Sequence, residues 1–160
     1  MKIDRFSIFG QYFLEVESEG DFILRASIII SPTNIEKFEE SKLPTQIAEF
    51  FEKYREHSGT VLPDTLFMFN EKTEKYRQIL LYLKNNVLSG DSISYKNLGK
   101  IFGFHPRVVG MIVAKNPFHL IIPCHRVVGS DNSLSGYSAE GGLNTKKAFL
   151  DFERQTGVFG

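Results

Sequence analysis

The chain has 160 residues, of which 42% are hydrophobic and 24% charged, and this composition predicts a folded, soluble protein of one domain or two small ones. Apolar runs such as 28–30 and 120–122 are too short to span a bilayer, and the N-terminus has no apolar segment typical of a signal peptide. We therefore expect a cytoplasmic protein without membrane contact. The single cysteine, Cys124, excludes an intramolecular disulfide and a zinc site built on several cysteines.

The net charge of zero is the sum of two opposite halves. Residues 1–70 carry a net charge of −5, and residues 71–160 carry +5. No acidic residue lies between Asp91 and Asp131. This asymmetry indicates two units, the basic one facing an anion, although an ordinary solvated surface is an alternative interpretation. The bases of the acid-free stretch are Lys96, Lys100, Arg107, Lys115 and Arg126.

The first half predicts strands followed by a helix. Residues 6–13 and 22–30 are rich in β-branched and aromatic side chains, and residues 18–21 supply a turn between them. Residues 44–57 have the apolar spacing of an amphipathic helix, and residues 58–70 are a linker or an edge strand. Nothing here suggests catalysis, so we expect residues 1–70 to form a supporting α/β domain.

The second half, residues 71–160, predicts mainly helices. The first covers 71–87, a second runs over 95–102 with Ser94 as its cap and Gly103 as its end, and a third covers 105–115. Two short helices about a glycine turn are typical of a helix-turn-helix, and together with the acid-free stretch they favour a nucleic-acid partner.

Cys124 lies in the string Pro-Cys-His-Arg. A lone cysteine is usually a small buried hydrophobe, but His125 and Arg126 would favour a thiolate, so we expect its pKa to be lowered toward neutrality. Adjacent side chains on a strand point to opposite faces, so contact between Cys124 and His125 requires a bend or a bridging water. A third group should orient the histidine, and spacing does not choose among the nearby carboxylates Asp131, Asp151 and Glu153.

The string 123–127, preceded by Asn116-Pro117 and Ile121-Ile122, resembles the active-site segment of the O6-alkylguanine-DNA alkyltransferases. The resemblance extends over residues 94–153, whereas the first 70 residues match only in general character. It implies an α/β (α+β) protein in which a ribonuclease H-like N-terminal domain supports a mainly helical domain with a helix-turn-helix and an active-site loop. Further motifs in family order are Ser94-Tyr95, Arg107-Val108-Val109-Gly110, Gly136-Tyr137-Ser138, Gly141-Gly142-Leu143, Lys146 and Glu153.

The resemblance implies DNA repair by a methylated-DNA–protein-cysteine methyltransferase. An alkyl group, typically methyl, would pass irreversibly from O6 of guanine in double-stranded DNA to Cys124 after the base is flipped out from the minor groove. O4-alkylthymine remains open as a second substrate. Because the product is a thioether, each molecule would act once. A monomer without cofactor or metal is expected.

The resemblance also implies residue roles. Cys124 would be the nucleophile, and His125, held by Glu153, would act through a water as its base. Arg107 would fill the place of the flipped base. Asn116 would brace the turn that presents the cysteine. Tyr95 would donate a hydrogen bond to the departing guanine, and Lys146 would polarise the site. DNA contacts are also expected from Tyr95, Lys96, Lys115 and Arg126, and contacts to the base from Val127, Tyr137 and Ser138.

Two positions depart from the family pattern. Ala139-Glu140 stands between Ser138 and Gly141, where many members run on directly, and this leaves open which loop residue lines the pocket. Met111 occupies a place that is often small in the family.

Three other functions are considered. A non-enzymatic module that flags damaged bases would lack the cysteine. A transcription regulator would leave the Pro-Cys-His-Arg string unexplained. A cysteine hydrolase would need an oxyanion hole and multiple turnovers, and the sequence suggests neither.

Overall fold

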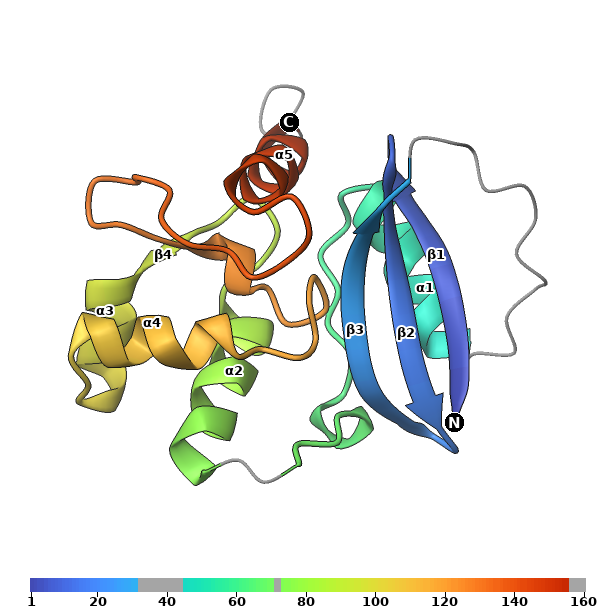
Figure 1. Cartoon of the computed structure of the whole chain (residues 1–160), viewed down its shortest axis with the longest axis horizontal. Coiled ribbons are helices and arrows are strands. Elements are labelled where there is room, and N and C mark those ends of the chain that lie inside the picture. The colour runs from blue at the N-terminus through green and yellow to red at the C-terminus, as the bar shows by residue number, and fades with distance from the viewer. Residues whose placement is uncertain (32–44, 71–72, 156–160) are drawn as a thin grey trace.

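The computed structural model describes residues 1–31, 45–70 and 73–155. The fold is mixed α/β (Figure 1). In chain order its strands, helices and 3-10 helices (η) are β1 (Lys2–Phe9), β2 (Tyr12–Glu19), β3 (Phe22–Ile30), α1 (Thr45–Arg55), η1 (Asp64–Leu66), α2 (Glu74–Asn86), β4 (Ile93–Ser94), α3 (Tyr95–Phe102), α4 (Pro106–Ala114), η2 (Cys124–Arg126), β5 (Val127–Val128) and α5 (Leu143–Arg154).

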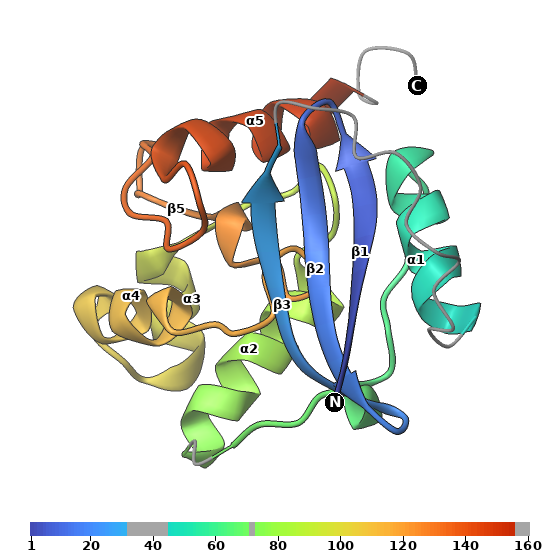
Figure 2. The same cartoon turned by 45° about the vertical axis from the view of Figure 1, so that its right-hand side comes forward.

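The N-terminal half contains an antiparallel sheet in the order β1-β2-β3, with α1 beside β1 (Figures 1 and 2). The prediction of one strand over 6–13 is wrong, because the chain reverses at Gly10 and divides this run between β1 and β2. Gly10 has a φ of 53°, a left-handed conformation that glycine adopts without steric cost. Strand-forming residues on both sides of a two-residue turn concealed the hairpin.

Two other predictions for the N-terminal half are confirmed. The expected turn is confirmed at Gly20 and Asp21, and α1 confirms the predicted helix, although Pro44 lies outside the described residues. Of the two alternatives for residues 58–70, the structure favours the linker, because the segment contains the short η1 and no strand. Phe67 forms an isolated parallel bridge with Ile23, and this segment therefore borders β3.

In the C-terminal half, α2, α3 and α4 confirm the three predicted helices. Ser94 accepts a hydrogen bond from the backbone N–H of Asn97, and Gly103 ends α3 with a φ of 75°. Pro106 stands at the first turn of α4, where its missing N–H costs nothing. The strands β4 and β5 form a short parallel pair, which joins the start of α3 to the segment after Cys124.

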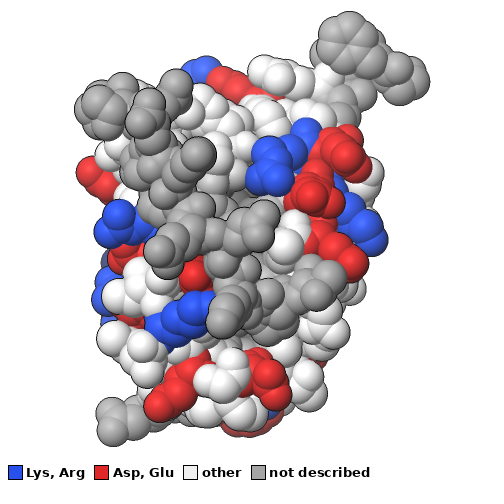
Figure 3. All heavy atoms as spheres, turned by 90° about the vertical axis from the view of Figure 1, so that its right-hand side faces the viewer, with Lys and Arg blue, Asp and Glu red and all other residues white. Residues whose placement is uncertain are grey.

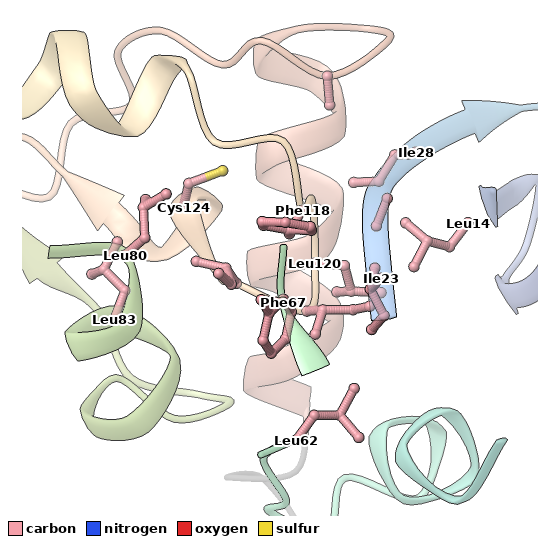
Figure 4. Packing of buried hydrophobic residues seen from close by; sticks show 14 of the residues in the cluster. Leu14, Ile23, Ile28, Leu62, Phe67, Leu80, Leu83, Phe118, Leu120 and Cys124 are labelled. Carbon is pink, nitrogen blue, oxygen red and sulfur yellow. The ribbon is translucent and has the colours of Figure 1, made fainter. Parts of the chain in front are cut away.

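One hydrophobic cluster connects the two halves. In Figure 4, Phe118 lies between Cys124 and the β3 residues Ile23 and Ile28. The backbone follows the same course, because Ala26 donates to the carbonyl of Pro117 at 2.8 Å and accepts from the N–H of His119 at 2.9 Å. The chain leading to the cysteine is thus fixed along β3.

The helix α5 packs on the β1–β2 turn, where Phe9 stacks on Phe152 with ring centroids 4.2 Å apart. The face on the side of α1 and β1 shows basic and acidic side chains interspersed over the residues described there (Figure 3). No helix among the described residues is long and apolar enough to cross a membrane.

Candidate active site

Asn116, just after α4, holds the turn that presents Cys124. Its amide is 3% exposed, donates to the carbonyl of Ile122 at 2.8 Å and accepts from the N–H of Phe118 at 2.9 Å. An amide side chain can satisfy backbone donors and acceptors together. Asn116 therefore closes the loop between α4 and η2 from inside.

The thiol borders a cavity of about 270 Å³. One wall is formed by Gly110 and Val113 of α4, another by the loop residues Tyr137 and Ser138, and Tyr95 also lines it. The volume lies just below the roughly 300–1,000 Å³ typical of pockets for drug-sized ligands. Such a cavity can take one small group placed against the sulfur.

Burial raises the pKa of the Cys124 thiol to about 11, and the hydrogen bond from Asn116 and the charge of Lys146 offset this only in part. The expectation of a lowered pKa is therefore wrong. The neighbours that prompted it, His125 and Arg126, both direct their side chains to Glu153. The resting cysteine is therefore a neutral thiol, and a thiolate would form only with a proton acceptor at hand.

The adjacent His125 has a defined environment. The Nε2 atom of His125 lies 2.8 Å from both carboxylate oxygens of Glu153, so the structure selects this carboxylate from the three that the sequence left open. Burial lowers the pKa of His125, which keeps the ring neutral. Burial alone would raise the pKa of Glu153, but the facing His125 and Arg126 hold it below its ordinary value.

These protonation states orient the imidazole. With Glu153 ionised, the Nε2–H of His125 donates to it, and Nδ1 is left as an acceptor. Within the part of the chain that the structure describes, this buried Nδ1 has no hydrogen-bond partner. An imidazole in this state can take a proton at Nδ1.

Lys146 joins the C-terminal helix to the loop beside the cavity. Its fully buried ammonium donates to the carbonyls of Val127 at 2.7 Å and of Ser135 and Gly136 at 3.2 Å each. It also donates to the hydroxyl of Tyr95 at 3.4 Å. Burial lowers the pKa of Lys146 to about 8. Lys146 therefore holds the loop in place and also puts a positive charge close to the cavity.

The outer surface of α4 has a different character. Arg107 and Lys115 are exposed near its two ends, and the apolar side chains of Val108 and Met111 are 38% and 63% exposed. The outer surface of α4 thus carries exposed apolar side chains between two basic ones. Lys96 is exposed on the neighbouring helix α3.

Comparison with known proteins identifies the family. A model described as "6-O-methylguanine DNA methyltransferase, DNA binding domain" matches residues 74–155. The chain belongs to this family. The resemblance drawn from the sequence is thereby confirmed.

Curated members of the methyltransferase family are similar over most of this chain. The methylated-DNA–protein-cysteine methyltransferase of Methanocaldococcus jannaschii is 30% identical, over 90% of this chain and 89% of the relative. That of Methanocaldococcus vulcanius is 29% identical, with 91% and 93% covered. The fold is also similar to that of the Mycobacterium tuberculosis OGT in complex with DNA, with a TM-score of 0.70 at 22% identity over 89% of this chain and 87% of that one.

For this methyltransferase-family chain, most residues singled out from the sequence lie together. Val127 is buried, and its carbonyl accepts from Lys146, while Tyr137 and Ser138 line the cavity. Arg126 lies in the same region, but its environment differs from the expected one. It is 7% exposed, its Nε donates to Glu153 at 2.6 Å, and its Nη1 donates to the carbonyl of Val87 at 2.8 Å. This geometry speaks against the prediction that Arg126 contacts DNA, because its charge is used inside the protein.

Sequence reasoning assigned nothing to His119, although it lies against the loop. Its Nε2 is 3.3 Å from Oγ of Ser138, and burial lowers its pKa to about 4. No local signal marks it, since its place depends on the pairing of Phe118 with β3. Among the described residues, no group of three or more His, Cys, Asp or Glu is arranged to hold a metal ion.

Proposed function

We propose that this protein repairs alkylated DNA by transferring the alkyl group from O6 of guanine in double-stranded DNA to the sulfur of Cys124. One observation carries the assignment. A buried thiol faces a cavity of base size, next to a neutral histidine whose second nitrogen is held by Glu153. Membership in the methyltransferase family supports the same reaction.

The proton moves first in this reaction. The thiol of Cys124 loses its proton through a water to Nδ1 of His125, and Glu153 stabilises the imidazolium that results. The thiolate then attacks the alkyl carbon. The carbon–sulfur bond forms as the bond between carbon and O6 breaks, and guanine leaves with the electron pair. The thioether product is stable, so each molecule reacts once.

The leaving guanine needs a donor in the cavity. The Tyr95 hydroxyl donates to the carbonyl of Ser135 at 2.9 Å. It must exchange this partner for the base. Lys146, whose ammonium is 3.4 Å from that hydroxyl, places positive charge where the guanine anion develops.

DNA is proposed to lie on the α3–α4 surface, with these helices as a helix-turn-helix placed in the minor groove. Arg107 would occupy the stack when the damaged base turns into the cavity, because its planar cation can stack while staying charged. Lys96 and Lys115 are proposed to contact phosphates. Val108 and Met111 are proposed to lose their solvent exposure against the groove.

The division into a ribonuclease H-like unit over 1–70 and a DNA-binding unit over 71–160 is also a proposal, as are a monomeric state and a cytoplasmic location. An antiparallel three-stranded sheet followed by a helix supports the first unit. The cluster around Phe118 supports a fixed docking of the two, since it contains residues from both.

Intact mass spectrometry tests the function. The protein is incubated with an oligonucleotide duplex that carries O6-methylguanine, and a gain of one methyl group is expected, located on Cys124 by peptide mapping. The Cys124→Ala variant should gain nothing and still bind the duplex. A wild-type protein that binds without gaining mass would support the flagging module. Sustained turnover at substoichiometric protein would contradict the single-use reaction.

A further inference from the structure

The two residues that depart from the family pattern, Ala139 and Glu140, connect the cavity loop to the N-terminal sheet. A carboxylate oxygen of Glu140 accepts a hydrogen bond from the backbone N–H of Ile30 at 3.0 Å. Ile30 is the last residue of β3, which is an edge strand of the described sheet. Figure 2 shows the segment before α5 beside this end of β3. The bond joins residues 110 positions apart in the chain.

The loop around Glu140 is closely packed. Its carbonyl accepts from the hydroxyl of Thr145 at 2.5 Å, and the carbonyl of Ala139 accepts from the N–H of Gly142 at 3.1 Å. Gly141 has a φ of +84°, and a Cβ there would collide with the side chains of Ile30 and Thr145. The segment therefore fits between β3 and α5 with no room for a larger residue at position 141.

The same loop forms a wall of the cavity that holds Cys124. Tyr137 and Ser138 line this cavity, and they stand between two attachment points. On one side Lys146 holds the carbonyls of Ser135 and Gly136. On the other side Glu140 holds the edge of β3. The first attachment belongs to the C-terminal half and the second to the N-terminal sheet.

We propose that Glu140 is a positioning residue for alkyl transfer, through which the N-terminal sheet sets the wall formed by Tyr137 and Ser138. The proposal rests on the proposed function. It assigns the inserted residues a role and gives the N-terminal half a direct effect on the base cavity. Glu140 touches neither the base nor the sulfur in this role. It acts by keeping the wall in the geometry that the reacting atoms require.

The chemistry of the contact suits such a role. The edge N–H of a strand has no partner within its sheet, and a carboxylate accepts a stronger hydrogen bond from it than a neutral group would. Because Glu140 is exposed, the bond adds little to global stability. Loss of this bond should loosen the loop and slow transfer, with little change in the melting temperature.

Two substitutions separate positioning from charge. Glu140→Ala removes the acceptor, whereas Glu140→Gln keeps a carbonyl oxygen at the same reach and removes only the charge. Asp151→Ala is the matched control, since this exposed carboxylate pairs with Lys147 on the surface of α5. The rates to measure are single-turnover transfer from duplex O6-methylguanine and from free O6-benzylguanine. Amide hydrogen exchange over 135–142 and thermal unfolding accompany them.

We expect Glu140→Ala to slow transfer from both substrates roughly tenfold and to speed exchange in the loop, with a fall in melting temperature of at most about 4 °C. Glu140→Gln should restore both rates to within about twofold of wild type. The Asp151→Ala control should match the wild type in all measurements.

Three outcomes would overturn the proposal. The first is an unchanged rate in Glu140→Ala. The second is faster reaction with duplex in both variants, which would mean that the carboxylate only repels DNA. The third is a loss of rate that follows global unfolding, without selective exchange in the loop. In each case the wild-type protein still gains its methyl group, so failure here is distinguishable from failure of the proposed function.

Discussion

The surroundings of the Cys124 cavity and the outer surface of α4 differ in which side chains they bury and which they expose. Beside the cavity, charged side chains are buried: Lys146 and Glu153 are at most 1% exposed, and both are hydrogen-bonded. On α4, apolar side chains are exposed, with Met111 at 63%. The polar groups of the first region are paired within the protein, whereas the apolar groups of the second face solvent, where the proposed DNA contact would cover them.

This difference assigns separate tasks to the two regions. Buried charges that are already paired lose no solvation when a base enters, so the chemistry is organised in advance. Exposed apolar groups gain free energy when they are covered, so the proposed DNA contact would draw binding energy from the α4 surface. Substitutions in the cavity should therefore affect folding and transfer together, while substitutions on α4 should affect only duplex DNA.

The largest effect is expected from Glu153→Gln. It leaves the buried Arg126 cation without its carboxylate, and it should lower the free energy of unfolding by about 3–5 kcal/mol. Chemical denaturation measures this loss. The control is Asp151→Asn on the same helix, whose exposed pair with Lys147 should cost at most about 0.5 kcal/mol. Equal losses of unfolding free energy in both variants would show that the buried carboxylate stabilises the protein no more than the exposed one.

The next effect concerns pH. Burial lowers the folded-state pKa of both His125 and His119, the latter to about 4, so below pH 6.5 the unfolded chain binds protons that the folded protein does not. Stability should fall as the pH drops from 6.5 toward 5, by up to about 1.4 kcal/mol per pH unit for each histidine. Denaturation at several pH values measures the slope, and His119→Gln should reduce it. A slope that stays flat, or that rises toward acid, would contradict a neutral buried His125.

A smaller effect is expected from Arg107→Ala on the surface. Transfer from duplex DNA should slow by about tenfold or more, because nothing replaces the flipped base in the stack, while transfer from free O6-benzylguanine should stay within about twofold. Lys100→Ala removes an exposed charge from α3 and controls for general attraction to phosphates. If transfer from both substrates slows equally in Arg107→Ala, Arg107 acts on the reaction in the cavity and not on DNA at the surface.

The smallest effect is expected from Met111→Ala. Stability should change by less than about 0.5 kcal/mol, because the side chain is mostly exposed. Affinity for duplex DNA should fall about two- to fivefold as contact with the groove is lost. Val61→Ala, an exposed apolar residue of the N-terminal half, should change neither quantity. Binding titrations that give the same affinity for Met111→Ala and wild type would show that α4 does not bury this side chain on DNA.

Much about this protein is fixed by local sequence. The helices α2, α3 and α4 follow from apolar spacing, and their ends follow from single residues such as Ser94 and Gly103. These signals work because a cap or a left-handed glycine acts within a few residues of itself. The Pro-Cys-His-Arg string, with the motifs in family order around it, likewise indicated the family and the proposed nucleophile without any knowledge of the fold.

Only the tertiary structure decided how those residues are used. It selected Glu153 as the partner of His125, turned Arg126 inward, raised the pKa of Cys124 and brought Glu140 to Ile30. Each outcome depends on burial or on contacts between distant segments, and neither is encoded in the spacing of neighbours. A histidine beside a cysteine in sequence can direct its ring elsewhere, and the low dielectric of the interior then outweighs the adjacent charge.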